Sequence, residues 1–181
     1  MYKFSRFLAI SLAFMALNSA PAKAEVYRDQ SVPITSVEEL DINQYLGLWY
    51  EIARFPNWFE RDCQGVTAEY ALRDDGKISV RNTCHKGAPD GPEKVANGLA
   101  WKAAPGQLKV TFTPLLPFIN GDYWVLYVDP DYQVAVVGSP AGKTGWVLAR
   151  SPDIAPAVYD KAVSVLTAMG YDISKLELIA H

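Results

Sequence analysis

The sequence predicts an all-β fold: an eight-stranded, up-and-down antiparallel β-barrel with a C-terminal α-helix packed on its outside. Two observations lead to this expectation. Eight short segments rich in β-branched and aromatic residues follow one another and are separated by turn residues. One longer amphipathic segment, at 153–169, follows the last of them with the spacing of a helix. Closure into a barrel removes both edges of the sheet, and eight strands leave an interior that is packed or holds one small ligand.

The first 24 residues have the features of a secretory signal peptide and are expected to lie outside the fold. Lys3 and Arg6 make a positive start, an apolar run follows, and residues 22–24 have the small-x-small form of a cleavage site. The apolar run is too short to span a bilayer, which argues against a membrane anchor. No cysteine follows this run, so the attachment residue of a bacterial lipoprotein is missing. We therefore expect a soluble, exported, periplasmic protein.

The remaining 157 residues are enough for one domain with a sizeable core. Loss of Lys3, Arg6 and Lys23 takes the formal net charge from −3 to −6. The remainder contains no block of basic residues, so nothing indicates a nucleic-acid partner. Residues 25–40 lack periodicity and predict an extended N-terminal arm, and 41–181 are expected to form the barrel with its helix.

The elements of the barrel can be assigned in order. A short helical turn comes first, because Asp41 can cap it and Gly47 can end it. Alternation is clearest in the fifth strand, where Leu108, Val110 and Phe112 share one face. The predicted strands are 48–55, 65–72, 77–83, 94–102, 107–113, 122–129, 132–138 and 144–150.

The helix at 153–169 is needed as a cover, because the last three strands are apolar on both faces. Ser151 or Asp153 is expected to cap it, Pro152 suits its first turn, and Gly170 is expected to end it. Its expected apolar stripe is Ile154, Val158, Ala162, Val165, Leu166 and Met169.

Three separate features meet at one end of the barrel by the parity of the strands. Gly47 and Trp49 start the first strand, Asp129 and Tyr132 lie between strands six and seven, and Arg150 ends strand eight. Trp49 can plug this floor with the Arg150 guanidinium packed over its indole. We interpret all five residues as structural, closing the barrel rather than binding its contents.

These five floor residues resemble the three sequence motifs of the lipocalins. Residues 46–55, 59–61 and 72–76 are similar to the bacterial lipocalin subgroup, which is related to apolipoprotein D and the insect bilin-binding proteins. The resemblance covers about 41–178. It implies the barrel with its helix, and binding, storage or transport of a small lipophilic ligand, a fatty acid or a lysophospholipid, in the bacterial cell envelope. It implies neither a cofactor nor a metal.

The two cysteines, Cys63 and Cys84, flank one predicted hairpin, whose turn at 72–76 sets the strands side by side. In an exported protein such a pair is expected to form a disulfide. The alternative is a free or catalytic thiol, and some barrels of the family are enzymes that use an internal thiol. No G-x-S-x-G, H-E-x-x-H or glycine-rich phosphate loop occurs. We therefore expect a binding protein, with a thiol-dependent enzyme as an alternative.

For the cavity wall we take the face of the first strand that carries Trp49, together with aromatic residues of strands two, five and eight. A single β-bulge would reverse the inward face of a strand. Glu51 shares the inward parity, and a structural ion pair is favoured over contact with a lipid head group. The candidate ligand-contacting residues are Ala53, Phe55, Tyr70, Phe112, Phe118, Trp146 and Leu148.

Two connections at the open end, around 56–59 and 115–119, are unexpectedly apolar. Such clusters mark an interaction surface, or else fold inward to cap the barrel. The first reading predicts transient contact with a membrane surface, or a barrel that docks a protein partner through its mouth. We expect a monomer or weak dimer. The lid and mouth candidates are Trp58, Phe59, Leu115, Leu116 and Ile119.

Overall fold

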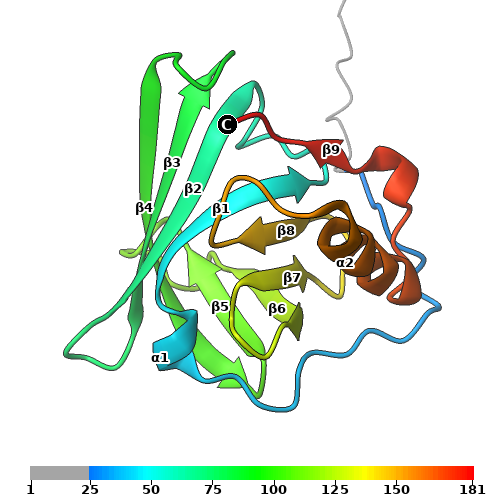
Figure 1. The fold of residues 1–181 in the computed structure, drawn as a ribbon. Helices are drawn as coiled ribbons and strands as arrows, with labels where there is room; N and C mark the ends of the chain where they lie inside the picture. Colours follow the sequence, from blue (N-terminus) through cyan, green and yellow to red (C-terminus); the bar gives the residue numbers. More distant parts are fainter. Residues whose placement is uncertain (1–24) are drawn as a thin grey trace, which may run out of the picture.

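The computed structural model describes residues 25–181, and the expected signal peptide at 1–24 lies outside the described residues. Eight antiparallel strands follow one another around a closed barrel, because β1 pairs with both β2 and β8 (Figure 1). The expected fold class is confirmed. The strands are β1 (Gly47–Arg54), β2 (Cys63–Leu72), β3 (Ile78–Lys86), β4 (Glu93–Ala104), β5 (Gln107–Thr111), β6 (Gly121–Val128), β7 (Val134–Gly138) and β8 (Gly145–Ala149).

One further strand was not expected. The two-residue β9 (Glu177–Leu178) pairs with the end of β1 opposite Ala53 and Arg54. Just before it lies a single 3-10 turn, η1 (Ile173–Lys175). A strand of two residues is too short to show alternation, so only the folded barrel can bring this segment against β1. Beyond it, the His181 imidazole lies 2.9 Å from the Glu51 carbonyl oxygen and packs edge-on against Tyr50.

Helix α1 (Ile42–Tyr45) is the expected capped turn beneath the barrel (Figure 1). The Asp41 carboxylate accepts a hydrogen bond from the Asn43 amide, which satisfies one of the free donors at the helix start. The chain then turns into β1 at Gly47, whose φ of +90° is a conformation that residues with a Cβ rarely adopt.

Helix α2 (Pro156–Ala168) begins three residues later than expected. Its N-cap is Ala155, which makes no side-chain cap, so the expected caps Ser151 and Asp153 are wrong. The reason is Pro156, which pushes the preceding residue out of the helical region and occupies the first helical position itself. Gly170, with a φ of +83°, follows the helix end as expected.

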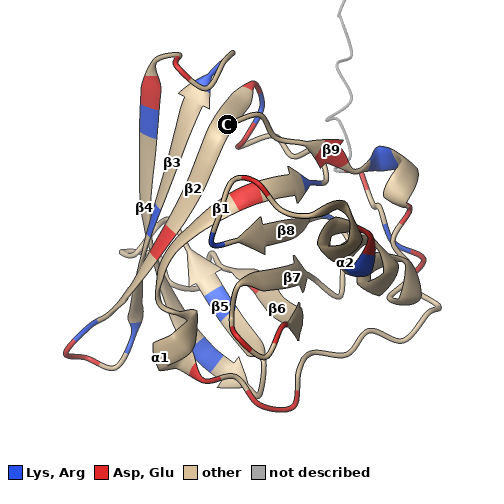
Figure 2. Cartoon of the chain, in the orientation of Figure 1, with Lys and Arg blue, Asp and Glu red and all other residues tan. Residues whose placement is uncertain are grey.

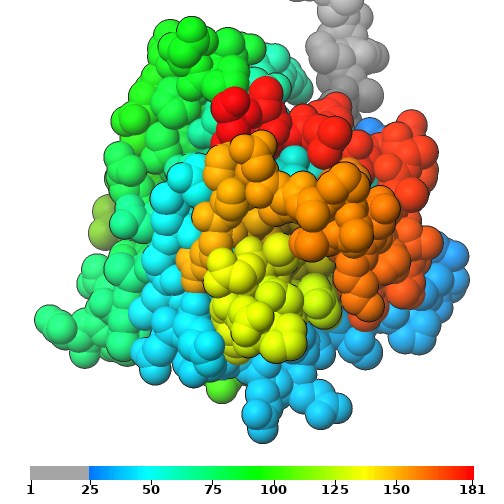
Figure 3. All heavy atoms as spheres, viewed as in Figure 1, coloured from blue at the N-terminus to red at the C-terminus, as the bar shows by residue number. Residues whose placement is uncertain are grey.

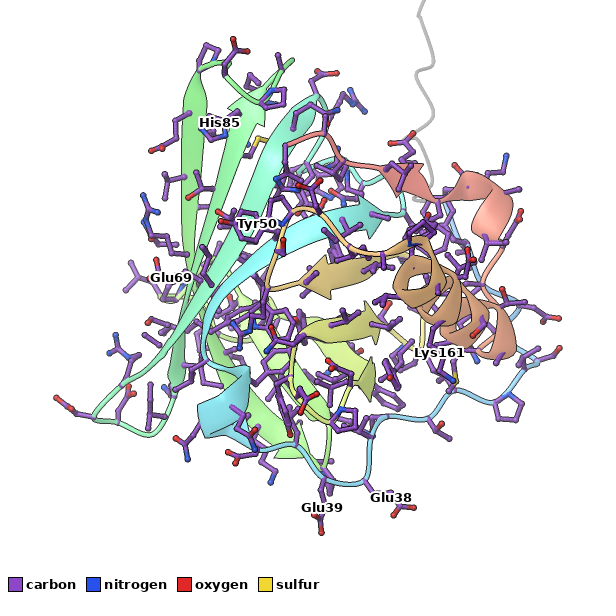
Figure 4. All side chains as sticks on the ribbon, viewed as in Figure 1. Glu38, Glu39, Tyr50, Glu69, His85 and Lys161 are labelled. Carbon is purple, nitrogen blue, oxygen red and sulfur yellow. A yellow bond between two sulfur atoms is a disulfide. The ribbon has the colours of Figure 1, made fainter. Side chains whose placement is uncertain are left out.

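The buried face of α2 is narrower than the expected stripe. Ala162 and Leu166 are fully buried against the barrel, but Val158 is 39% exposed, and Tyr159 packs against the core in its place. Figure 3 shows the helix lying closely against β6 and β7. Lys161 projects from α2 in Figure 4, and its Nζ lies 5.8 Å from the centroid of the Tyr127 ring of β6.

Two hydrophobic cores result. One lies inside the barrel around Trp49 and Val137, and the other lies between the barrel wall and α2, around Phe55 and Leu166. The N-terminal arm joins the second core. Tyr27 is buried there, and its ring stacks on Phe55 at 5.1 Å. The arm is therefore a packed part of the outer layer.

Cys63 and Cys84 form the expected disulfide between β2 and β3, with their Cα atoms 5.3 Å apart. Together with Val66 and Ile179 they make a small third cluster beneath the C-terminal segment. Charged residues of both signs are scattered over the strands and loops (Figure 2). Among residues 25–181, no helix is long and apolar enough to cross a bilayer.

Candidate ligand cavity

The barrel encloses a cavity of about 420 Å³, which is in the range of small-molecule binding sites. Most of its wall is aromatic or aliphatic. Leu108, Val110 and Phe112 of the β5 segment point into it together, as the alternation predicted. Phe112 has room because Gly98 lies opposite, where an added Cβ would be 3.0 Å from the ring. The other apolar wall residues include Ile42, Leu46, Ala68, Tyr70, Ile78, Val80, Ala100, Tyr123, Trp146 and Leu148.

Trp49 and Arg150 close the floor of the cavity. Trp49 is fully buried, and the Arg150 guanidinium carbon lies 3.8 Å from the centroid of its ring. The Trp49 indole nitrogen donates to the Tyr45 carbonyl at 2.8 Å. Arg150 donates to the carbonyl oxygens of Gln44, Leu46 and Leu48 at 2.6–2.8 Å. This one side chain therefore ties α1 and the start of β1 to the end of β8.

The turn between β6 and β7 completes the floor. The Asp129 carboxylate accepts from the backbone amides of Gln133 and Val134, which holds the turn. The Tyr132 hydroxyl accepts from the Asp41 amide at 2.9 Å, and Arg150 Nε donates to the Tyr132 carbonyl at 3.2 Å. The five predicted floor residues thus lie at one end of the barrel, where Arg150 contacts the Trp49 ring and donates to the Tyr132 carbonyl.

Three phenols form a polar cluster in the lower cavity. The Tyr123 hydroxyl lies 2.8 Å from that of Tyr45 and 3.1 Å from that of Tyr70. Burial raises the pKa of all three hydroxyl groups, and that of Tyr70 to about 12, so each keeps its proton at neutral pH. Two of the three protons suffice for the two hydrogen bonds, and the third can be donated to a ligand.

A buried acidic cluster lies in the wall beside β1. Arg54 Nη1 donates to the Glu51 carboxylate at 2.9 Å, and both side chains are about 5% exposed. The Glu60 carboxylate, from the loop after β1, accepts from the indole nitrogen of Trp146 at 3.2 Å and from the Asn57 amide. Burial, followed by the charge of Glu60, raises the pKa of Glu51 well above its ordinary value, and Arg54 opposes this shift.

Within the described part of the chain, the wall also holds one buried acceptor without a partner. The Oδ1 atom of Asn82, on β3, is buried without a hydrogen-bond partner. Ala68 of β2 pairs with Asn82 on one side and with Trp49 on the other, so Asn82 lies two strands away from β1. A buried acceptor without a partner costs about 1–3 kcal/mol until a donor reaches it.

The structure corrects three of the expected wall residues. Ala53 and Phe55 lie in the outer core beneath α2 and not in the cavity, because the β1–β8 register shifts between Glu51 and Ala53. This β-bulge reverses the inward face of the strand, so Arg54 is the next residue on the side of Glu51. Phe118 is also misplaced: it is 76% exposed in the loop after β5 and does not line the cavity.

The mouth residues divide into two groups. Phe59 and Ile119 line the cavity, as does Trp58, which is nevertheless 79% exposed. Leu115 and Leu116 do not line it, and Leu115 is 95% exposed. One set of side chains therefore lies at the opening of the cavity, while the other faces outward.

The polar wall residues that sequence reasoning missed include Tyr45, Glu60, Asn82 and Tyr123. Tyr123 could have been found, because it has the inward parity of β6. Tyr45 belongs to the floor helix, Glu60 to an irregular loop, and Asn82 to a strand of mixed pattern, so no periodic signal marks them. Within residues 25–181, no group of three or more potential ligands could hold a metal ion.

Comparison with known proteins agrees with this geometry. A family model described as a lipocalin-like domain matches residues 40–181. Temperature-induced lipocalin-1 of Arabidopsis thaliana is 41% identical over 149 residues, covering 77% of this chain and 78% of its own. Outer membrane lipoprotein Blc of Escherichia coli K12 is 41% identical over 146 residues, covering 78% and 80%. Apolipoprotein D of Mus musculus is 31% identical over 176 residues, covering 91% and 90%.

Solved structures support the fold. Insecticyanin from the tobacco hornworm Manduca sexta superposes with a TM-score of 0.63 at 21% identity, over 82% of this chain and 85% of its own. The cockroach allergen Per a 4 also gives 0.63, at 20% identity, over 84% and 96%. The closed barrel, the floor residues, the family model and these relatives agree. The chain belongs to the lipocalin family, whose members bind small hydrophobic ligands.

Proposed function

We propose that this lipocalin binds, stores or carries a single-chain lipid, of the fatty acid or lysophospholipid kind, in a bacterial cell envelope. The observation that carries the proposal is the apolar cavity of about 420 Å³ above a floor sealed by Trp49 and Arg150. Both cysteines are consumed in the disulfide, so the alternative of a thiol-dependent enzyme lacks a nucleophile.

The energetics favour an acyl chain as the ligand. Each methylene group moved from water into an apolar site contributes about 0.8 kcal/mol. About ten buried methylene groups would contribute about 8 kcal/mol, against an association cost of about 4 kcal/mol or more. An acyl chain is therefore long enough for useful affinity without any strong polar contact.

The test is displacement of a neutral fluorescent probe, N-phenyl-1-naphthylamine, by single-chain lipids, together with native mass spectrometry of protein purified gently from its own host. Lipid that copurifies, or probe displaced at micromolar concentrations, supports the proposal. A protein that carries no lipid and shows no displacement has another function.

Exchange of ligand with a membrane is the proposed role of the exposed mouth. Leu115 and Phe118 are both largely exposed, in a loop that has no charged residue between Thr113 and Asn120. We expect binding to lipid vesicles, measured by sedimentation, to fall in a Leu115→Asp, Phe118→Asp double variant. If vesicles never bind but the variant loses a protein partner, the mouth is a protein-docking surface instead.

An exported location is supported by the disulfide, which needs an oxidising compartment. The Escherichia coli relative is named as an outer membrane lipoprotein, which places that protein in the envelope. Fractionation of the host cell tests this part of the proposal. Finding the protein in the cytoplasm with free thiols would contradict it.

A further inference from the structure

The charged side chains that line the cavity are all acidic. Among residues 25–181, the cavity wall contains three carboxylates, Glu51, Glu60 and Asp122, and no lysine, arginine or histidine. Asp122 pairs with Lys109 at 2.7 Å, and both side chains are about one-third exposed, so this pair is partly screened by water. The unscreened charge facing a ligand therefore comes from Glu51 and Glu60.

Among the residues that the structure describes, Arg54 is the one cation that contacts these two carboxylates. Arg54 Nη1 donates to the Glu51 carboxylate at 2.9 Å, and its Nη2 donates to the Cys63 carbonyl at 3.1 Å. The partners of Glu60 are the neutral Asn57 and Trp146. With both carboxylates ionised the cluster has one excess negative charge, and with Glu51 protonated it is neutral. In neither state does it leave a cation for an anionic ligand.

The negative potential extends across the cavity. Beside burial, which is the main cause of the raised pKa of Tyr70, the charges of Glu51 and Glu60 raise it further, and the charge of Arg150 opposes them. A carboxylate head placed among the phenols would meet this same potential, against which a single phenolic proton offers one neutral hydrogen bond. A carboxylate at either polar site therefore adds a further negative charge to a buried acidic region, which is costly.

Glu60 and Asn82 offer hydrogen-bond acceptors to a ligand. The donors of Arg54, Asn57 and Trp146 already have protein acceptors. The atoms that a ligand can reach include the unpaired Oδ1 of Asn82 and the carboxylate oxygens of Glu60. Both accept hydrogen bonds, so a head group that donates hydrogen bonds complements them.

We propose that the cavity selects single-chain amphiphiles whose head group donates hydrogen bonds and carries no net negative charge. An ammonium head supplies the positive charge that the acidic cluster lacks, and a hydroxyl head donates without changing the charge. The carboxylate of a fatty acid does neither. The inference rests on the proposed function, and it favours lipids with a net neutral or cationic donor head group, zwitterionic lysophospholipids included, over fatty acids.

The experiment compares three competitors with one chain length against N-phenyl-1-naphthylamine, at neutral pH and below their aggregation limits: dodecylamine, monolaurin and lauric acid. We expect the amine and the glycerol ester to displace the probe at concentrations about tenfold or more below that of the acid, a difference of about 1.4 kcal/mol. If dodecylamine displaces the probe at a lower concentration than monolaurin, the positive charge contributes to binding. If the two act at equal concentrations, hydrogen-bond donation is enough.

The Glu60→Gln variant tests whether the charge of Glu60 causes the head-group preference. Its amide oxygen can still accept from Trp146, so the loop should keep its shape while the charge is lost. We expect the advantage of dodecylamine over lauric acid to shrink about tenfold, with monolaurin little changed. Asp122→Asn, at the solvent-screened pair, is the matched control and should keep the wild-type preference. Should Glu60→Gln fail to fold, judged by its thermal melt, Glu60→Asn serves as the second variant.

The outcomes separate the two proposals. Lauric acid that competes as well as dodecylamine and monolaurin overturns the head-group selection and leaves the lipid-binding function standing. A preference that survives loss of the Glu60 charge also overturns it, because the acidic cluster would not be its source. If the probe binds but none of the three lipids displaces it, the proposed function itself fails.

Discussion

Truncation of Trp49 to alanine should be among the most destabilising single changes in this barrel. The side chain is fully buried, and removal of a large aromatic from such a site costs about 3–5 kcal/mol. The change also removes the indole donor from the Tyr45 carbonyl and the ring beneath the Arg150 guanidinium, interactions of about 1 kcal/mol each. We expect a loss near 5 kcal/mol, which is comparable with the whole stability of a marginal domain.

Trp146→Ala is the matched comparison, because Trp146 lies in the cavity wall and is only partly buried. Its packing partner is Tyr123, with ring centroids 6.4 Å apart, and one face is open to the cavity. We expect a smaller loss of stability, about 1–2 kcal/mol, with a clear loss of lipid affinity.

Both variants would be measured by urea denaturation with the disulfide intact, and by probe displacement. A Trp49→Ala protein that keeps its stability but loses affinity, beside a Trp146→Ala protein with full affinity, would mean that the floor and the mouth have been exchanged.

The remaining predictions concern the disulfide, the floor turn and the acidic cluster. Thiol titration of denatured, unreduced protein should find no free thiol. The Cys63→Ser, Cys84→Ser variant should lose about 3 kcal/mol of unfolding free energy, because the disulfide no longer restricts the unfolded chain. A urea midpoint unchanged from wild type would contradict this. Gly47→Ala should lower the free energy of unfolding by about 1–2 kcal/mol, because the φ of Gly47 is +90°. An added Cβ would make only ordinary contacts, so the backbone conformation alone is penalised. An unchanged free energy of unfolding would contradict this. Because burial raises the folded-state pKa of Glu51 above its ordinary 4.5, the folded protein holds a proton that the unfolded chain has released. The free energy of unfolding should therefore fall as pH rises from about 4.5 toward that raised pKa, and Glu51→Gln should flatten this part of the profile. Parallel pH profiles of the two proteins would refute the assignment.

Much of the fold could be predicted because its signals are local. The alternation of Leu108, Val110 and Phe112 marks one inward face, and turn residues mark the ends of the strands. The helix start was misplaced although its signal was local too, because Pro156 outweighed two good capping residues upstream. Strand parity was enough to gather the floor residues at one end, because no bulge lies between Gly47 and Trp49 in their pairing with β2.

The sequence by itself determined the closed barrel, its outer helix, the disulfide and the family, because alternation, turn chemistry and short motifs depend on neighbours along the chain. Only the tertiary structure decided what the cavity presents to a ligand. One extra residue in β1 moved Ala53 and Phe55 to the outer core, and the loop after β1 carried Glu60 back to Trp146, a partner 86 positions away. A bulge and a loop path depend on packing between distant segments, so no periodicity along the chain records them.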